Sequence, residues 1–149
     1  MQLTWVYKSF GELTTTELYA ILQLRSEVFV VEQNCVYQDV DGKDKKSFHL
    51  TAWQGDELAA YTRLVEAGVS FPEASIGRVI TSPKYRGLGI GITLLEKSIE
   101  HILETYATNK IRIGAQLYLK KFYEGFGFVV CSDEFLEDGI PHIEMILKR

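Results

Sequence analysis

The sequence predicts an α+β fold in which helices cover both faces of a mixed β-sheet. A run of strand-like segments precedes a glycine-rich turn, and a helix, a strand, a second helix and two strands follow it. Length is a further indication, because a chain of 149 residues makes one domain that can bury roughly 70% of its unfolded surface. We therefore expect a single domain with a substantial core.

The N-terminal part is predicted to contain a strand, a long helix and a loop. Residues 3–7 alternate as a strand does. Thr14 and Glu17 have the spacing of a helix capping box, and apolar side chains continue from there at helical intervals as far as Phe29. Residues 34–46 are polar and rich in turn-forming side chains, so they are expected to form a loop.

Three more strands are predicted before the glycine-rich turn, at residues 48–53, 58–66 and 75–82. The first two flank a Gly-Asp pair that suits a hairpin turn. After the glycine-rich turn, a helix presents one apolar face, made of Ile92, Leu95, Ile99, Ile102 and Leu103. The remaining elements are a strand at 111–115, a short helix at 117–125, a strand at 126–131, a turn at 133–141 and a closing strand at 142–147.

The composition argues against several classes of protein. The chain is 46% hydrophobic and 24% charged, as ordinary globular proteins are, and its net charge of −4 argues against a general nucleic-acid-binding surface. No stretch approaches the roughly 20 apolar residues of a membrane span, and the N-terminal residues lack the apolar run of a signal peptide. Cys35 and Cys131 indicate neither a disulfide framework nor a pair of metal ligands. We therefore expect a reduced, cytoplasmic protein with no metal, no nucleic-acid partner and no membrane partner.

The glycine-rich turn has the composition of an anion site. Gly87, Gly89 and Gly91 follow Lys84 and Arg86 where the helix begins, although each glycine in a helix costs about 1 kcal/mol relative to alanine. The first N–H groups of a helix lack intrahelical partners, and the helix dipole adds about half a positive charge there. Without Cβ atoms, a phosphate can approach those groups closely. The turn thus predicts a pyrophosphate-like ligand, and the alternative is a glycine cluster that only permits a tight turn.

Two common nucleotide motifs do not fit this turn. A P-loop has Lys and then Ser or Thr after its last glycine, whereas Ile92 and Thr93 follow Gly91. The dinucleotide motif G-x-G-x-x-G lacks its third glycine whether it is started from Gly87 or from Gly89. Neither ATP or GTP in the P-loop mode nor a dinucleotide is therefore indicated.

The turn instead resembles the GNAT superfamily of acyl-CoA-dependent N-acetyltransferases. Arg86, Gly89 and Gly91 match its R/Q-x-x-G-x-G/A signature, in the usual setting of strand end, turn and helix. Downstream, Gln116 stands seven positions before Tyr123 in a segment that resembles the second motif of the family, which commonly has Asn in place of this Gln.

Two further segments, residues 25–44 and 138–145, resemble the ElaA branch of the superfamily. The resemblance covers essentially the whole chain. It implies one N-acetyltransferase domain over residues 1–149, with a largely antiparallel sheet that splays at the acetyl-CoA site.

The resemblance implies that acetyl-CoA is the acetyl donor. In the family, the backbone at the end of the fourth strand pairs with the pantetheine arm, and the pyrophosphate lies on the turn that follows. The cofactor-binding positions implied here are Val79, Ile80, Thr81, Arg86, Gly87, Leu88, Gly89, Ile90, Gly91, Ile92 and Gln116.

The resemblance also implies a catalytic residue. Attack by an amine on a thioester needs a base or water for the amine proton, a donor to the oxyanion and an acid for the thiolate. Tyr123 stands at the position of the family's acid, and the alternative is an aromatic side chain of the core. A free backbone N–H near Ile80 corresponds to the usual oxyanion donor. No base is implied, because Ile111 stands where some relatives have glutamate.

Other reactive side chains have structural as well as functional interpretations. His49 and His142 lie at the starts of predicted strands, where each is either a base or a structural histidine. His101 lies among glutamates on a predicted helix, as a solvated side chain does. Neither Cys35 nor Cys131 has a sequence neighbour that would lower its thiol pKa, which favours packing over a role as an acyl-carrying nucleophile.

An acidic segment in the loop also has two interpretations, a solvated surface or attraction of a cationic acceptor; its members are Glu32, Asp39, Asp41 and Asp44. The function that the resemblance implies is transfer of an acetyl group from acetyl-CoA directly to a primary amine of a small molecule or peptide. The alternative is a non-catalytic CoA-binding module that acts as a sensor or scaffold. Synthesis of an acyl-homoserine lactone on a related fold fits the glycine signature less well. The oligomeric state is left open, with a homodimer as one alternative.

Overall fold

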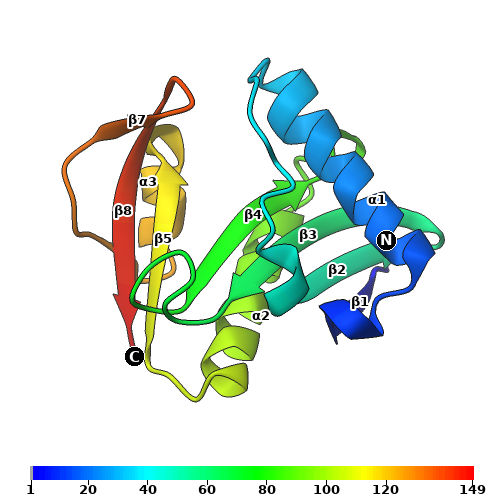
Figure 1. Ribbon diagram of the computed structural model, residues 1–149, viewed down its shortest axis with the longest axis horizontal. Coiled ribbons are helices and arrows are strands. Elements are labelled where there is room, and N and C mark those ends of the chain that lie inside the picture. Colours follow the sequence, from blue (N-terminus) through cyan, green and yellow to red (C-terminus); the bar gives the residue numbers. More distant parts are fainter. Residues whose placement is uncertain (1) are drawn as a thin grey trace.

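The computed structural model describes residues 2–149, which form two antiparallel sheets side by side (Figure 1). The first sheet has the order β1-β2-β3-β4. In the second sheet β8 is central, between β5 and β6, and also pairs with β7. The strands are β1 (Thr4–Ser9), β2 (Phe48–Gln54), β3 (Glu57–Val65), β4 (Ser75–Thr81), β5 (Lys110–Gln116), β6 (Val129–Val130), β7 (Phe135–Glu137) and β8 (Ile140–Lys148).

Three α-helices accompany the sheets, α1 (Thr15–Arg25), α2 (Ile90–Thr105) and α3 (Lys120–Glu124). α1 begins with the predicted capping box, in which Thr14 and Glu17 bond each other's backbone N–H groups. It continues as a π-helix, Ser26–Glu32. Short 3-10 turns occur at Phe10–Glu12, Asp44–Lys46, Pro83–Tyr85 and Leu117–Leu119. None of the helices within residues 2–149 has the length and apolarity needed to cross a bilayer.

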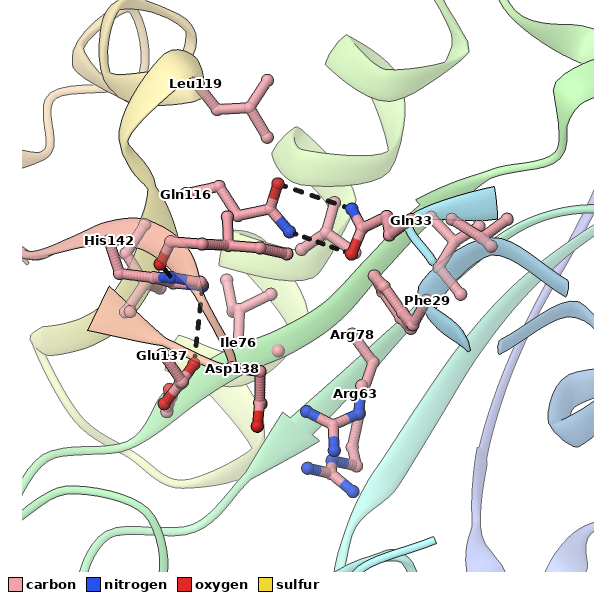
Figure 2. Close-up of a pocket in the computed structure, with 18 of the residues that line it drawn as sticks. Phe29, Gln33, Arg63, Ile76, Arg78, Gln116, Leu119, Glu137, Asp138 and His142 are labelled. Atoms are coloured by element: carbon pink, nitrogen blue, oxygen red, sulfur yellow. Dashed lines mark hydrogen bonds and ion pairs between the residues drawn. The ribbon is translucent and has the colours of Figure 1, made fainter. Parts of the chain in front are cut away.

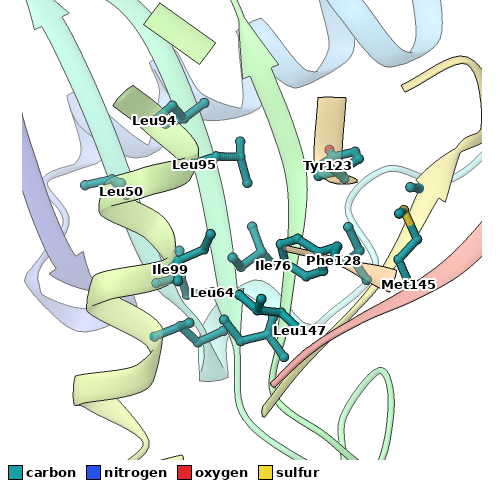
Figure 3. Packing of buried hydrophobic residues seen from close by; sticks show 14 of the residues in the cluster. Leu50, Leu64, Ile76, Leu94, Leu95, Ile99, Tyr123, Phe128, Met145 and Leu147 are labelled. Carbon is teal, nitrogen blue, oxygen red and sulfur yellow. The ribbon is translucent and has the colours of Figure 1, made fainter. Parts of the chain in front are cut away.

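The two long helices lie on opposite faces of the first sheet. α1 and the π-helix bury Ile21, Leu24 and Val28 against Tyr61 and Ile80. α2 packs on the other face, where its apolar side chains join β5 and β8 in the main core; the members labelled in Figure 3 include Leu50, Leu64, Ile76, Leu94, Leu95, Ile99, Tyr123, Phe128, Met145 and Leu147. The predicted α+β class with helices on both faces is confirmed.

β4 and β5 run parallel but are joined by backbone hydrogen bonding only where both begin. Ala74 and Ile111 form a parallel bridge, and the Arg112 N–H donates to the Ala74 carbonyl at 2.9 Å. Further along, β4 bulges opposite β3, and Arg78 adopts a φ of +51° there. The two strands therefore diverge toward Thr81 and Gln116, which separates the two sheets and gives the splay that the resemblance to the GNAT superfamily implied.

Several predicted boundaries were wrong for local reasons. Only Val129–Val130 forms a strand in the range 126–131, because the residues before it stay bonded to the end of α3. The predicted turn at 133–141 holds β7 and a tight hairpin turn, in which Asp138 and Gly139 both have positive φ. Ile92, predicted on the apolar face of α2, is 52% exposed because the buried face of the helix starts with Ile90 and continues through Leu94.

Candidate active site

A cleft of about 1040 Å³ fills the space between the diverging strands (Figure 2). β4 lines it with Val79, Ile80 and Thr81, whereas Gln116 lines it from the end of β5 and Tyr123 from α3. The cleft exists because β4 has a strand partner on one edge only beyond Ala74. Eight of the twelve residues predicted for the site line this one cleft: Val79, Ile80, Thr81, Arg86, Gly87, Gly91, Gln116 and Tyr123.

The open edge of β4 offers backbone groups to an extended ligand. The Ser82 N–H donates to the Ala59 carbonyl at 2.8 Å, and Arg86 Nε donates to the Thr81 carbonyl at 3.2 Å. Because backbone groups alternate between the edges of a strand, Thr81 directs its N–H and C=O toward the open edge, and Ile80 directs its own toward β3. An extended arm that adds to this edge would meet Thr81.

The glycine turn bends at one end of the cleft. Gly87 and Gly89 have φ values of +80° and +76°, which other residues rarely adopt, and Gly89 caps the start of α2. Gly91 lies in the first turn of α2 and lines the cleft. A second, smaller hollow on this turn is lined by other predicted positions, which are Leu88, Gly89 and Ile90.

Arg86 is engaged by a side chain from another element. Its guanidinium forms a two-pronged ion pair with Glu32, at 2.7 and 2.9 Å, at the end of the π-helix. This hydrogen bond and the charge of Arg86 lower the pKa of Glu32. The pair therefore links the π-helix to the turn on which the pyrophosphate is expected.

Gln116 is also engaged from the π-helix side. Its side-chain amide and that of Gln33 exchange two long hydrogen bonds, both at 3.4 Å (Figure 2). Gln33 follows directly after the π-helix and thus reaches across to β5. Sequence reasoning did not single out Gln33, although it lies in the segment that resembles the ElaA branch. The longer amide at position 116, where the family commonly has Asn, meets this partner.

Tyr123 lies at the inner wall of the cleft and is 5% exposed. Its ring packs edge-on against Phe122 and Phe128, so the side chain belongs to the core as well as to the cleft. Burial, with a smaller effect of Tyr118, raises the pKa of its hydroxyl. The hydroxyl stays protonated at neutral pH and is therefore able to donate a proton.

The acidic segment does not present free carboxylates, which argues against the interpretation that it attracts a cationic acceptor. Asp39, Asp41 and Asp44 are paired with three arginines from other elements, Arg25, Arg63 and Arg78. The three carboxylates thus neutralise three guanidinium groups. Glu32, the fourth member, is paired with Arg86. The arginines in these pairs lie up to 54 residues away in sequence, so the sequence of the loop alone did not reveal that its carboxylates are paired.

The histidines and cysteines separate into structural and cleft-lining residues. His49 is 1% exposed, and its two ring nitrogens are bonded to the Tyr61 hydroxyl and the Asp44 carbonyl, so it is structural. His101 stacks on Tyr7 with ring centroids 4.0 Å apart.

His142 and Cys35 line the cleft, and Cys131 lies on the surface. Partial desolvation, with a smaller contribution from the nearby charges of Glu144 and Glu73, raises the pKa of the Cys131 thiol, which disfavours a nucleophile there. Within residues 2–149 no cluster of three or more His, Cys, Asp or Glu side chains could hold a metal ion.

Comparison with known proteins identifies the family. The family described as an acetyltransferase (GNAT) domain matches residues 14–149. The chain belongs to the GNAT family. ElaA of Escherichia coli strain K12 is 43% identical over 143 residues, which are 95% of this chain and 94% of ElaA. The predicted resemblance to the ElaA branch of GNAT proteins is confirmed.

Solved structures confirm the GNAT fold. The crystal structure of Escherichia coli ElaA has a TM-score of 0.93 at 40% identity and covers 99% of this chain and 100% of that one. An acyl-CoA N-acyltransferase from Pseudomonas aeruginosa has a TM-score of 0.93 at 42% identity, covering 98% and 99%. A CoA-dependent acyl-homoserine lactone synthase, 16% identical with a TM-score of 0.80 over 99% of this chain and 83% of its own, shares the fold.

GNAT proteins are acyltransferases that use an acyl-CoA as cosubstrate, and the residues of the cleft fit such a molecule. The open edge of β4 suits the extended arm, and the glycine turn at the start of α2 suits the phosphates. Two residues that sequence reasoning missed also line the cleft, Arg78 at the β4 bulge and Glu137 at the end of β7. Neither stands in a recognisable motif, and only the fold brings them there.

Proposed function

We propose that the protein transfers an acetyl group from acetyl-CoA directly to a primary amine of a small molecule or peptide. The observation that carries the proposal is the single cleft that joins the glycine turn, the open edge of β4 and the Tyr123 hydroxyl. A site of this kind holds an acyl donor at one end and leaves the other end for an acceptor.

Acetyl-CoA, when bound, supplies the activated acyl carbon. Thr81 would pair its backbone with the extended arm, and the turn from Gly87 to Ile92 would hold the pyrophosphate with help from Arg86. Gln116 would bond the arm from the β5 side after releasing Gln33. Tyr123, whose hydroxyl is protonated at neutral pH, would give its proton to the leaving sulfur. The remaining predicted contacts, at Leu88, Gly89 and Ile90, would be made by the backbone of the turn.

The end of the cleft away from the glycine turn is where the acceptor would enter. Its lining is polar and includes Lys43, Ser70 and Arg78 on one wall and Glu137 and Asp138 on the other. Charges of both signs suit a polar acceptor better than an apolar one. A small molecule or the end of a peptide would fit such a lining.

The test is acetyl transfer by the purified protein. Release of the free CoA thiol is followed with acetyl-CoA and a panel of primary amines that includes amino acids, polyamines and short peptides. We expect release with at least one amine and formation of the matching amide by mass spectrometry. A parallel series with longer acyl-CoA donors compares their kcat/KM values. Tight CoA binding by calorimetry without turnover on any amine would favour the non-catalytic sensor or scaffold instead.

A further inference from the structure

His142 lies where β8 enters the cleft. The strand register places it opposite Gln116 on β5 and opposite Phe135 on β7, whose ring stacks on the imidazole with centroids 5.9 Å apart. Directly opposed residues of antiparallel strands share one face of the sheet. The imidazole and the Gln116 amide therefore lie on the same side, and both line the cleft (Figure 2).

The hydrogen bonds of His142 fix which nitrogen can act as a base. Nδ1 lies 2.7 Å from the Ile140 carbonyl oxygen, and because a carbonyl only accepts, Nδ1 carries a hydrogen. In the neutral ring Nε2 thus holds the lone pair. Nε2 lies 3.4 Å from a carboxylate oxygen of Glu137, whose side chain is 61% exposed. A proton taken up at Nε2 would face this carboxylate.

The charged groups around His142 are largely paired among themselves, apart from those of the hairpin turn. Asp138 follows Glu137 in the turn between β7 and β8, and both line the cleft. Next along the same face of the sheet, Glu144 is bonded to Arg112. The facing wall carries Asp41, Lys43, Arg63 and Arg78, of which the aspartate and the arginines form ion pairs. Tyr37, Tyr118 and Tyr123 are the tyrosines in the same lining.

We propose that His142 is the general base of the reaction, a catalytic residue that takes a proton from the ammonium group of the acceptor, with Glu137 as its positioning residue. The inference rests on the proposed N-acetyl transfer. Nε2 takes one ammonium proton and later passes it to water. The freed nitrogen pair forms the new C–N bond while the C–S bond breaks and its electrons leave on sulfur. The nitrogen then loses a second proton, which returns through water to the Tyr123 oxygen and replaces the one that Tyr123 gave to the sulfur.

The first test is the pH dependence of kcat/KM for an alkylamine found in the acceptor panel. The wild-type protein should show an acid limb, in which kcat/KM falls with falling pH because the base becomes protonated. His142→Gln should lose that limb, with kcat/KM near neutral pH lowered by roughly 10²-fold or more. His101→Gln, the matched control outside the cleft, should keep both. Glu137→Gln should move the limb to lower pH, and this exposed side chain can be changed without disturbing the core.

The second test does not depend on turnover. Carbon-13 label at Cε1 of the histidines gives one NMR signal per ring, and the signal absent from His142→Gln is that of His142. The chemical shift of this signal should change with pH over the same range as the kinetic limb. In Glu137→Gln that pH range should move to lower values. An acid limb that persists in His142→Gln, or a His142 signal that does not titrate, would overturn the inference while acetyl transfer by the wild type stands. Failure of the wild type to acetylate any amine would overturn the proposed function and the base together.

Discussion

At the scale of single residues, Gly91 offers a cleaner test of the phosphate turn than Gly89. Gly89 has a φ of +76°, so any larger residue there strains the backbone whatever ligand binds. Gly91 has an ordinary helical backbone, and a Cβ added to it would meet Phe122 and Thr81 only at 3.7 and 3.8 Å, which are normal contacts. Side chains at position 91 can therefore report on the cleft without disturbing the fold.

We predict that Gly91→Val weakens CoA binding at least tenfold, about 1.4 kcal/mol, because its branched side chain enters the space of the phosphate. Gly91→Ala should bind CoA nearly as well as the wild type, since the family signature accepts alanine at this position. Titration calorimetry gives the two affinities and thermal melting shows that both variants fold. Equal affinities for the valine and alanine variants would remove the start of α2 from the site.

Tyr123 is the second residue whose role can be separated from its packing. Tyr123→Phe keeps the ring against Phe122 and Phe128 and deletes only the hydroxyl. We predict a fall in kcat of roughly 10²–10⁴-fold, as for loss of a general acid, with little change in CoA affinity. Tyr118→Phe is the matched control, because Tyr118 lines the same cleft but is 76% exposed. A Tyr123→Phe enzyme as fast as the control, with chemistry rate-limiting, would leave this tyrosine a packing residue.

The sequence predicted the side chains that belong to motifs, but it did not predict the distant side chains that contact them. Tyr123, Gln116 and the glycines carry a spacing that can be read along the chain. Gln33 is bonded to Gln116, which is 83 residues away in sequence, and no spacing of residues along the chain predicts that contact. A side chain whose role depends on a distant partner is visible only once the fold brings the two together.

At the scale of elements, the π-helix borders the cleft at its C-terminal end. Its last residue, Glu32, is paired with Arg86 on the turn, and the next residue, Gln33, is bonded to Gln116 at the end of β5. The wider turns of a π-helix are uncommon and are frequently found at functional sites. The apolar spacing up to Phe29 predicted a helix here, but periodicity alone does not separate a π-helix from an α-helix.

We predict that Glu32→Gln raises the affinity for CoA. The carboxylate occupies the guanidinium of Arg86, and it would lie beside the negative pyrophosphate, so its removal frees the cation and relieves the repulsion. A gain of about fivefold, roughly 1 kcal/mol, is expected at low salt and should shrink as salt screens the charges. Glu27→Gln is the control, since Glu27 is an exposed carboxylate of the same helix.

A lower CoA affinity in Glu32→Gln than in this control would mean that the ion pair holds Arg86 in its binding position. In that case the π-helix would be a support of the cofactor site rather than a competitor for it.

At the scale of the whole molecule, sequence periodicity predicted most of the strand and helix order, whereas the splay between the sheets was implied only by the family resemblance. Periodicity and turn residues identify elements locally, whereas the separation of β4 from β5 depends on a single bridge at Ala74 and on the bulge at Arg78. Arg78 is not glycine although its φ is positive, so nothing in its identity indicates a bulge. The cleft, and hence the site, follows from that separation.

The electrostatic role of the loop was likewise not predictable from its own sequence. The loop of residues 34–46 has an acidic character in sequence, but its aspartates are paired with Arg25 of α1, Arg63 of β3 and Arg78 of β4. Arg25 and Arg63 are 0% and 3% exposed, so their charges must be compensated inside the protein. The loop thus joins α1 to the first sheet through ion pairs rather than through apolar packing.

Asp41 makes this network sensitive to acid. Burial alone would raise the pKa of its carboxyl, but hydrogen bonds and charge from Arg63, with the Lys43 N–H, hold the pKa at about 2, below its usual 3.8. A carboxyl whose pKa is lowered on folding stabilises the protein above its unfolded pKa, and this stabilisation is lost as pH falls through the folded pKa.

We predict that Asp41→Asn destabilises the protein near neutral pH by about 1–3 kcal/mol, because Arg63 is left partly uncompensated. Between about pH 4 and pH 2 the variant should lose less stability than the wild type, so the two unfolding curves converge. Urea unfolding across this range, with the exposed Asp133→Asn as control, measures both effects; a constant difference at every pH would show that Asp41 acts through packing and not through its charge.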